Sequence, residues 1–296
     1  MTLLVAGSAN LDFVVRVPHI PAPGETVLGD GLQTFPGGKG ANQAVACARA
    51  GGAATQMLLA LGADAHAAPI EASLRDAGVT LHIVRAAGAA TGTAFIGLPN
   101  GGENAIIVAS GANATLAAGD LPPLAGISHL LLQLETPLAV VAAFAQRARA
   151  AGVTVVLNAA PAQPLPPELL HDIDVLIVNE GELAAITGRM GRAVDLLADI
   201  RVPTCIVTLG VRGCVARQRG DVLQQPAFVV EVLDTTAAGD TFCGALVAAL
   251  SLGDPLPAAL RRASAAAALA CTRLGAQTSI PQRAEVDALL ASSAIT

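Results

Sequence analysis

The stretch DTTAAGDTFCGA, residues 234–245, places small residues and a carboxylate directly before a run of apolar and small residues that predicts a helix. Asp240 could simply cap that helix, because its oxygens accept from the N–H groups of the first turn. Ala238 and Gly239, however, let the backbone approach a ligand closely, and the free N–H groups at a helix start bind anions. A carboxylate beside an anion site suits phosphoryl transfer, in which a base accepts the proton of the attacking hydroxyl.

A second glycine-rich stretch, FPGGKGANQAVACARAGG, precedes another expected helix. It is not a Walker loop, because Gln33 and Gly40 stand where that motif needs a glycine and a serine or threonine. It also fails the dinucleotide pattern, because Gln43 stands where the third glycine belongs. With both motifs excluded, the glycines still allow a ligand to approach the loop backbone closely. Lys39 and Asn42 could then hydrogen-bond a polyhydroxylated ligand. The alternative is a tight turn with a solvated lysine.

The composition narrows the class of ligand. The 296 residues are 53% hydrophobic and 2% aromatic, with no Trp or Tyr, so the core must be built from Ala, Val, Leu and Ile. A net charge of −6 and the lack of a basic run argue against a nucleic-acid or anionic-membrane partner. The five cysteines, at positions 47, 205, 214, 243 and 271, lack zinc-type spacing and predict free thiols. The start of the chain resembles no signal peptide, and the longest uncharged stretch, 150–167, contains four prolines, which exclude a membrane-spanning helix. We therefore expect a cytoplasmic protein, and the charge pattern favours a small-molecule ligand.

Apolar runs alternate with Ala-rich segments along most of the chain. Continuous apolar runs that begin near residues 3, 55, 129, 153, 174 and 204 predict strands buried on both faces. Helices are expected at about 40–51, 66–77, 137–151, 180–187, 191–199, 240–252, 255–273 and 284–293. This alternation predicts an α/β fold with a doubly wound, mostly parallel sheet and helices on both faces.

Two segments, at about 12–35 and 91–109, break this pattern. They contain short strand-like runs joined by Gly, Pro and Asn turns, and they predict a small antiparallel β lid that stands off the main sheet. No low-complexity linker separates them from the rest, so we expect one domain over residues 1–296. The exposed edge and apolar face of such a lid could pair with a second copy, which predicts a homodimer.

Together, these motifs resemble the ribokinase branch of the PfkB family of carbohydrate kinases. The resemblance rests on GSANLD, PGETV, GGKGANQAVA, QLETP, VNEGE with TLGVRG, and DTTAAGDTF followed by RLGAQTSIP, in that order over residues 7–281. It implies ATP-dependent phosphorylation of a sugar hydroxyl, most of all O5 of D-ribose, with Asp240 as the catalytic base. It also implies that the N–H groups of Ala237, Ala238, Gly239 and Asp240 hold the phosphoryl group in transit.

The sugar contacts that the resemblance implies are mainly carboxylates, amides and a lysine, which can pair with adjacent hydroxyl groups. These residues are Asn10, Asp12, Gly38, Lys39, Asn42, Glu135 and Asp240. Structural alternatives exist, since Asn10 and Asp12 could form a turn at a strand end and Glu135 could cap the helix after Pro137.

The resemblance also assigns a nucleotide site. Asn179 and Glu182 would organise Mg²⁺ and the phosphates through water, with Glu180 able to share that charge. The alternative is a polar loop that leads into the helix at 180–187. Ser264 departs from the family pattern, because ribokinases often carry a histidine there near the adenine. The residues expected to line the nucleotide are Thr208, Gly210 and Gly213.

A monovalent-cation loop is the last feature that the resemblance implies. Such loops bind the ion largely through backbone carbonyls, so the expectation concerns backbone shape as well as side chains. Activation by K⁺ is therefore expected. The matching residues are Asp234 and Ser279, with the carbonyls near Thr236, Cys271, Leu274 and Ala276.

Other functions remain open at this point. The same transfer could act on another pentose, a hexose or a nucleoside. A non-catalytic sugar or nucleotide sensor could use the same fold, although the presence of Asp240 disfavours it. A dinucleotide-dependent oxidoreductase is disfavoured by the failed glycine spacing.

Overall fold

Most strands join into one large, mostly parallel sheet, in a computed structural model that describes residues 2–99 and 104–293. Only its two C-terminal strands pair antiparallel. In spatial order the nine strands are β13 (Asp221–Gln225), β12 (Cys214–Gln218), β11 (Thr204–Thr208), β10 (Val175–Asn179), β9 (Thr154–Asn158), β8 (Ile127–Leu132), β1 (Thr2–Ala6), β4 (Ala54–Leu61) and β5 (Thr80–Arg85).

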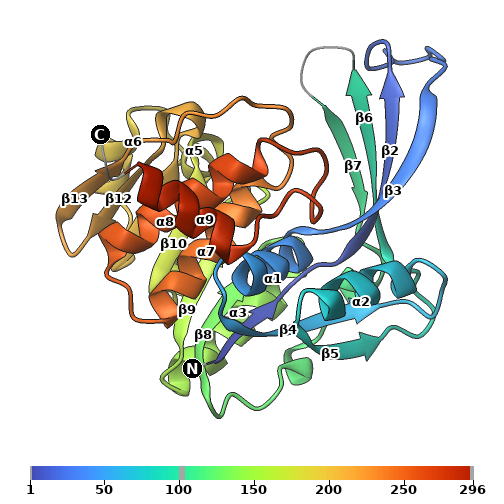
Figure 1. Ribbon diagram of the computed structural model, residues 1–296. Helices are drawn as coiled ribbons and strands as arrows, with labels where there is room; N and C mark the ends of the chain where they lie inside the picture. The colour runs from blue at the N-terminus through green and yellow to red at the C-terminus, as the bar shows by residue number, and fades with distance from the viewer. Residues whose placement is uncertain (1, 100–103, 294–296) are drawn as a thin grey trace.

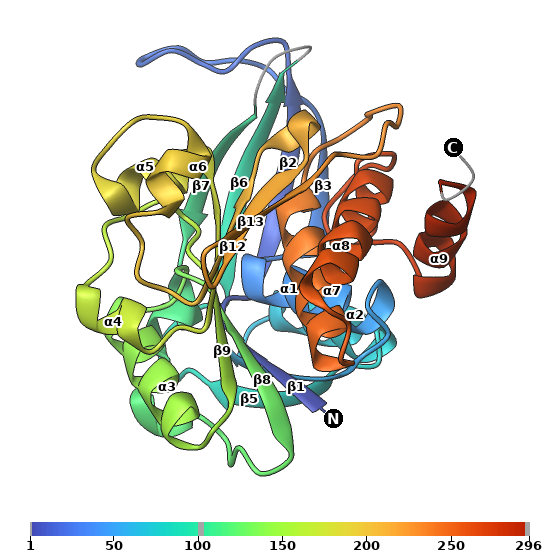
Figure 2. The ribbon, with the colours of Figure 1, turned by 90° about the vertical axis from the view of Figure 1, so that its left-hand side faces the viewer.

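Helices cover both faces of this sheet (Figure 2), which confirms the doubly wound α/β fold. One face carries α1 (Lys39–Arg49), α2 (Ala67–Asp76), α7 (Ala238–Ser251), α8 (Leu256–Ala270) and α9 (Arg283–Ser292). The other face carries α3 (Leu138–Ala150), α4 (Pro167–His171), α5 (Glu180–Thr187) and α6 (Ala193–Leu197). Short 3-10 helices lie in the connections: η1 (Gly111–Thr115), η2 (Ala118–Asp120) and η3 (Gly210–Arg212).

The strand sequences explain why the sheet is covered twice. Successive side chains of a strand point to opposite faces, and continuous apolar runs therefore need a core on each side. In β1, Leu3 and Val5 join the core under α1 and α7, whereas Leu4 and Ala6 join the core under α3. None of the helices within the described ranges combines the length and apolar character needed to cross a membrane.

The expectations from sequence missed three strands and one helix. The edge strands β5 and β13, with the neighbouring β12, are short and carry polar residues among apolar ones, so they lack the continuous apolar signal. The helix α4 has only five residues. The helix expected at 255–273 ends at Ala270, and the one expected at 191–199 is limited to α6.

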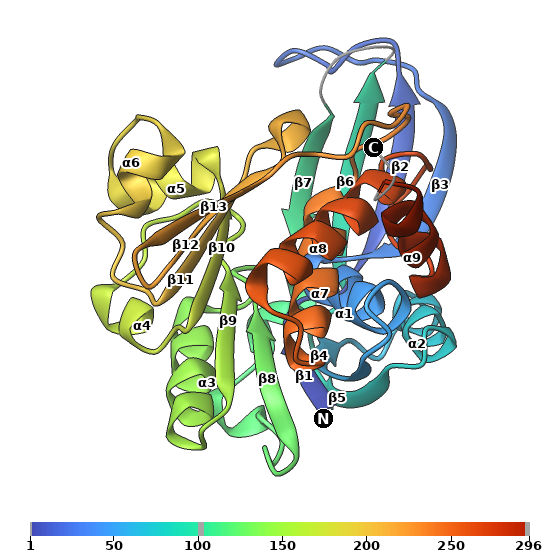
Figure 3. The ribbon, with the colours of Figure 1, turned by 60° about the vertical axis from the view of Figure 1, so that its left-hand side comes forward.

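The lid is a separate four-stranded sheet that stands away from the main body (Figures 1 and 3). Its outer pairs are antiparallel, but its central strands β2 and β6 are parallel, because both leave the body in the same direction. The lid is therefore mixed in strand direction. Of the segment expected at 91–109, residues 100–103 lie outside the described residues. In spatial order the lid strands are β3 (Asp30–Gly37), β2 (Asn10–Val17), β6 (Gly92–Pro99) and β7 (Ala105–Ala109).

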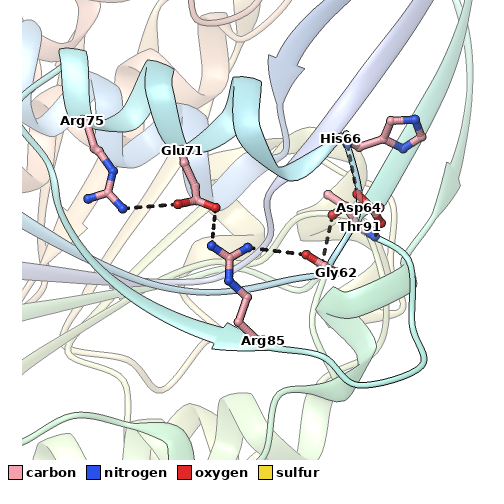
Figure 4. A network of polar contacts seen from close by, with 7 residues as sticks. All are labelled: Gly62, Asp64, His66, Glu71, Arg75, Arg85 and Thr91. Atoms are coloured by element: carbon pink, nitrogen blue, oxygen red, sulfur yellow. Dashed lines mark hydrogen bonds and ion pairs between the residues drawn. The ribbon is translucent and has the colours of Figure 1, made fainter.

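A polar network braces the base of the lid (Figure 4). The Asp64 carboxylate accepts from the backbone N–H groups of Thr91 at 2.7 Å and His66 at 3.0 Å. The Thr91 hydroxyl accepts from the N–H of Gly62 at 3.0 Å, and Arg85 donates to the Gly62 carbonyl. Because Thr91 immediately precedes β6, the network fixes the point at which β6 leaves the main body.

Helices α1 and α7 approach each other closely at Gly244. A Cβ atom at this position would lie 2.5 Å from the Gln43 carbonyl oxygen and 2.5 Å from the Ala46 Cβ. Only glycine fits such a contact without movement of one helix. The contact places the first turn of α1 beside the first turn of α7, where both glycine-rich stretches of the sequence begin their helices.

We expect Gly244→Ala to lower the free energy of unfolding by about 1–3 kcal/mol, because the added methyl group must separate the two helices. Urea unfolding followed by circular dichroism measures the change. Gly119→Ala is the matched control, because no atom lies within 4 Å of the added Cβ there. Equal stabilities of the two variants would contradict the close-packing account.

Candidate active site

Polar residues gather at the carboxyl ends of neighbouring parallel strands. Asn158 ends β9, Asn179 ends β10, and Asn10 and Glu135 follow β1 and β8. The strand order reverses between β1 and β8, and ligands of open α/β sheets bind at such a reversal. A cavity of about 350 Å³ lies there, and it brings together these predicted residues: Asn10, Asp12, Gly38, Lys39, Asn42, Glu135, Asn179, Glu182, Thr208, Thr236, Ala237, Gly239, Asp240 and Ala276.

A second cavity, of about 260 Å³, adjoins the first and is mainly apolar. The two cavities share Thr208, Thr235 and Gly239, so the first turn of α7 lies between them. Among the predicted nucleotide and cation residues, the second cavity is lined by Thr208, Gly210, Gly213 and Cys271, and Ser264 lines it too. The sequence therefore predicted residues of two adjoining cavities, one polar and one apolar.

The first turn of α7 presents backbone N–H groups between the cavities. Ala237 adopts the left-handed region at φ 57°, ψ 9°, which residues other than glycine rarely enter. Ala238 donates its N–H to the Thr235 carbonyl at 3.2 Å, so one of the four predicted anion-binding groups is already used within a turn. None of the hydrogen bonds among the described residues uses the N–H groups of Ala237, Gly239 or Asp240 as donors.

The Asp240 carboxylate is buried and held by two side-chain amides from α1. Asn42 Nδ2 donates to Asp240 Oδ2 at 2.9 Å, and Gln43 Nε2 donates to Asp240 Oδ1 at 2.9 Å. Sequence reasoning assigned Asn42 to the site but treated Gln43 only as a failed glycine. The available signal was a glutamine among the apolar residues of a helix that packs against the core.

The glycine-rich loop before α1 is fixed by side chains from two strand ends. Ser8 Oγ accepts from the N–H of Gly40 at 3.2 Å and donates to Glu135 Oε2 at 2.6 Å. The same Glu135 oxygen accepts from the N–H of Lys39 at 3.1 Å. Glu135 therefore orders the loop and does not cap α3, whose N-cap has no side-chain hydrogen bond. A Cβ at Gly38 would lie 2.8 Å from the backbone of Asn10, so the loop backbone passes directly over this strand.

Two buried acceptors of the polar cavity have no donor among the described residues. They are Asp12 Oδ1 and Asn42 Oδ1. Asn10, by contrast, is oriented by Asn113, which donates to Asn10 Oδ1 at 2.8 Å and also bonds the backbone of Ala9. Buried polar atoms without partners are rare in folded proteins, so the two orphaned acceptors fit a ligand that brings hydroxyl donors.

Four carboxylates and one lysine set the electrostatics of the polar cavity. Burial, with smaller contributions from Glu135 and Asp240, raises the pKa of Asp12 to about 7. Burial alone would lower the pKa of Lys39, but the nearby Asp240, Glu135 and Glu182 carboxylates outweigh it and raise the pKa. Lys39 therefore stays charged and offsets the negative charge around it.

Asn179 and Glu182 form a capping box at the start of α5. The Asn179 side chain accepts from the N–H of Glu182 at 2.8 Å, and Glu182 Oε2 accepts from the N–H of Asn179 at 2.7 Å. Burial, opposed in part by this N–H donor, raises the pKa of Glu182. None of the hydrogen bonds among the described residues uses Glu182 Oε1, which leaves it able to accept from a metal-bound water. Glu180 instead pairs with Arg212 at the surface.

The residues of the predicted cation loop come from two segments that meet through Asp234. Its carboxylate accepts from the N–H and hydroxyl of Thr236 at 2.8 and 2.6 Å and from the N–H of Gly275 at 2.9 Å. The Cys271 carbonyl accepts from the N–H of Asp234, and the Ala276 carbonyl accepts from the N–H and hydroxyl of Ser279. Asp234 thus joins the loop that precedes α7 to the loop that follows α8.

We expect Asp12→Asn to stabilise the protein, and to do so more at pH 8 than at pH 5. The raised pKa means that the folded state binds more protons than the unfolded state between about pH 4 and 7, so wild-type stability falls as the pH rises through that window. Asparagine carries no charge, so the variant avoids the cost of burying an ionised carboxylate. Its melting temperature should exceed that of wild type by about 5 °C at pH 8. The exposed Asp221→Asn is the control. A difference in melting temperature from wild type that does not grow with pH would refute the raised pKa of Asp12.

Comparison with known proteins agrees with the resemblance of the motifs. A model of the pfkB family carbohydrate kinases matches residues 2–283. A ribokinase of Haemophilus influenzae is 41% identical over an alignment of 296 positions, which covers 96% of this chain and 96% of that one. The structure of Thermotoga maritima ribokinase matches with a TM-score of 0.90 and 36% identity, over 98% of this chain and 99% of that one. Arabidopsis thaliana ribokinase in complex with ribose and ATP also matches with a TM-score of 0.90 and 36% identity, over 97% and 98%. By fold, motifs and sequence, the chain belongs to the pfkB family of carbohydrate kinases.

Proposed function

We propose that this chain is a ribokinase, which transfers the γ-phosphoryl group of ATP to O5 of D-ribose and releases ribose 5-phosphate and ADP. The observation that carries this proposal is the pair of orphaned acceptors, on Asp12 and Asn42, in the same cavity as the Asp240 carboxylate. The Haemophilus relative is named a ribokinase, and the Arabidopsis relative was solved with ribose and ATP, which supports both substrates.

The polar cavity would hold the sugar through its hydroxyl groups. Asp12 and Asn42 offer acceptors to sugar O–H groups, and Lys39 offers a charged donor to sugar oxygens. A site built from such groups rejects molecules that lack the hydroxyls, because its buried polar atoms would then remain unpaired. The lid strand β6 contributes Ala94 and Ile96 to the wall and would shield the acceptor from water.

In the transfer step, Asp240 accepts the proton of the O5 hydroxyl while O5 forms a bond to the γ-phosphorus. The bond between that phosphorus and the β–γ bridging oxygen breaks, and ADP leaves. The N–H groups of Gly239 and Asp240, at the dipole-positive end of α7, would donate to the phosphoryl oxygens as their charge redistributes. A carboxylate within hydrogen-bond reach of the acceptor is a suitable base for this reaction.

The apolar cavity would take the nucleotide base, since it adjoins the sugar cavity at Gly239 and is lined by Phe228 and Phe242. Mg²⁺, when bound, would neutralise phosphate charge, and it fits Glu182 because this ion retains most of its waters and one carboxylate oxygen is free to accept from them. We place the activity in the cytoplasm, where the five free cysteines would suit a reducing environment.

Activation by a monovalent cation is part of the proposal. The loops that contain Asp234 and Ser279 lie together, and Asp234 connects directly to the loop that forms the α7 N-terminus. A K⁺ ion on the carbonyls of these loops would therefore support the backbone that holds the phosphoryl group. The proposal rests on the proximity of the two loops and on the family resemblance.

We also propose a homodimer formed through the lid. Large apolar side chains are exposed on it, with 63% of Leu32, 51% of Phe95 and 71% of Ile107 accessible. Exposed apolar faces and open edges of small sheets favour pairing with a second copy. Pairing of two lids would cover these side chains.

The test of the catalytic proposal is ADP release from ATP with Mg²⁺ and K⁺, using D-ribose beside other pentoses, hexoses and nucleosides. We expect D-ribose to have the highest kcat/KM, 5-deoxy-D-ribose to give no turnover, and Asp240→Asn to lower kcat at least about 10²-fold. Replacement of K⁺ by tetramethylammonium should reduce kcat. Turnover of another acceptor alone would overturn the ribose assignment, and full activity of Asp240→Asn would overturn the role of the base.

The dimer is tested by light scattering during gel filtration at micromolar concentration. We expect wild type to elute as a dimer and Ile107→Lys as a monomer, because a charge would be buried between the lids. Val222→Lys, on the exposed edge strand β13, should remain dimeric. A monomeric wild type, or a dimer in both variants, would contradict pairing through the lid.

A further inference from the structure

We infer that Gln43 is a positioning residue for the catalytic carboxylate, at the centre of a buried chain of side-chain amides. The inference rests on the proposed role of Asp240 as the base. The chain runs from Gln133 at the end of β8, through Gln43 on α1, to Asp240 on α7 and Asn158 at the end of β9. It connects the central sheet to the first turn of α7.

Gln43 uses every hydrogen-bonding atom of its amide. Its Nε2 donates to Asp240 Oδ1 and to Asn158 Oδ1, both at 2.9 Å, and its Oε1 accepts from Gln133 Nε2 at 2.6 Å. Gln43 and Gln133 have no exposed surface, and Asn158 is nearly buried. A buried amide with partners on both ends is held in one orientation, because any rotation leaves a polar atom unpaired.

A backbone carbonyl determines which amide donates and which accepts in this network of buried side chains. Asn158 Nδ2 donates to the Ile177 carbonyl at 3.2 Å, so Asn158 must present its oxygen to Gln43. This oxygen requires a donor, which fixes the Nε2 side of Gln43 toward Asn158 and Asp240. A 180° flip of the Gln43 amide would place its oxygen against two oxygens and its nitrogen against the Gln133 nitrogen. The parallel strands β9 and β10 thereby determine that Asp240 receives a donor.

The consequence for the base is a fixed carboxylate plane. Gln43 donates to Oδ1 and Asn42 donates to Oδ2, so the two carboxylate oxygens are held independently. Lys39, Glu182 and Asp12 also influence this region electrostatically, but no hydrogen bond among the described residues joins their side chains to Asp240. Without Gln43 the carboxylate could rotate about its Cβ–Cγ bond, and the oxygen that takes the O5 proton would lose its alignment.

The test is a double-mutant cycle of Gln43→Met and Asp240→Asn. Gln43→Met keeps the length of the side chain and removes its polar atoms. Gln56→Met is the separate control, because Gln56 bonds His82 on a different part of the sheet. For Gln43→Met we expect kcat to fall about 10–100-fold with the KM for D-ribose within about threefold of wild type. In an Asp240→Asn background, Gln43→Met should cause no further loss of kcat, because it acts through Asp240.

Several outcomes would overturn the inference: an unchanged kcat, a raised KM with unchanged kcat, or an equal loss of kcat with and without Asp240. If Gln43→Met fails to fold by circular dichroism, Gln133→Met tests the same amide network, because it removes one of the three hydrogen bonds that hold the Gln43 amide without touching Asp240. The kcat of Gln133→Met should fall about 3–10-fold at constant KM. An unchanged kcat would refute the inference that the buried amides position Asp240. If wild type turns over only another acceptor, the ribose proposal fails, and the Gln43 test is run with that acceptor.

Discussion

The contact between the first turns of α1 and α7 governs the arrangement of the site. At this contact Asn42 and Gln43 donate to the Asp240 carboxylate, which would otherwise be a buried charge without fixed partners. The donors reach it because Gly244 lets the helices approach until their backbones touch. A loss of this close packing would move the amides away from the carboxylate and the loop before α1 away from the polar cavity.

The first turn of α7 also separates two cavities whose surfaces suit the proposed reaction. On one side, strand ends supply carboxylates and amides with unpartnered acceptors for hydroxyl groups; on the other, a mainly apolar wall suits a nucleotide base. Strand order places these environments together, because the sheet reverses between β1 and β8 and the lid enters over the same edge. The strain at Ala237 and the raised pKa of Asp12 are local costs at this point, consistent with a site shaped for a ligand.

Sequence reasoning predicted the doubly wound fold because the apolar runs of β1, β8, β9, β10 and β11 are continuous. It missed β5, β12 and β13, since short strands with interleaved polar residues give a weak pattern. At the site, the glycine-rich stretches predicted Lys39, Asn42 and Asp240, which line the polar cavity, because their candidate chemistry is visible within a short motif. Gln43, Gln133, Asn158, Ser8 and Asn113 were missed, because each acts through a partner about 30 to 200 positions away that only the tertiary structure brings into contact. The mixed lid was missed for the same reason, since the pairing of β2 with β6 joins two distant segments.

A crystal structure with D-ribose and a non-hydrolysable ATP analogue bound together would test most directly whether Asp240 is placed to act as the base. We expect the sugar O5 to lie within hydrogen-bond distance of the Asp240 carboxylate, with Gln43 and Asn42 still donating to that carboxylate. We also expect the terminal phosphate to lie on the N–H groups of Gly239 and Asp240 and the nucleotide base to lie in the apolar cavity. A sugar whose O5 points away from Asp240 would contradict the role of Asp240 as the base. A nucleotide bound away from the first turn of α7 would contradict the role of the Gly239 and Asp240 N–H groups.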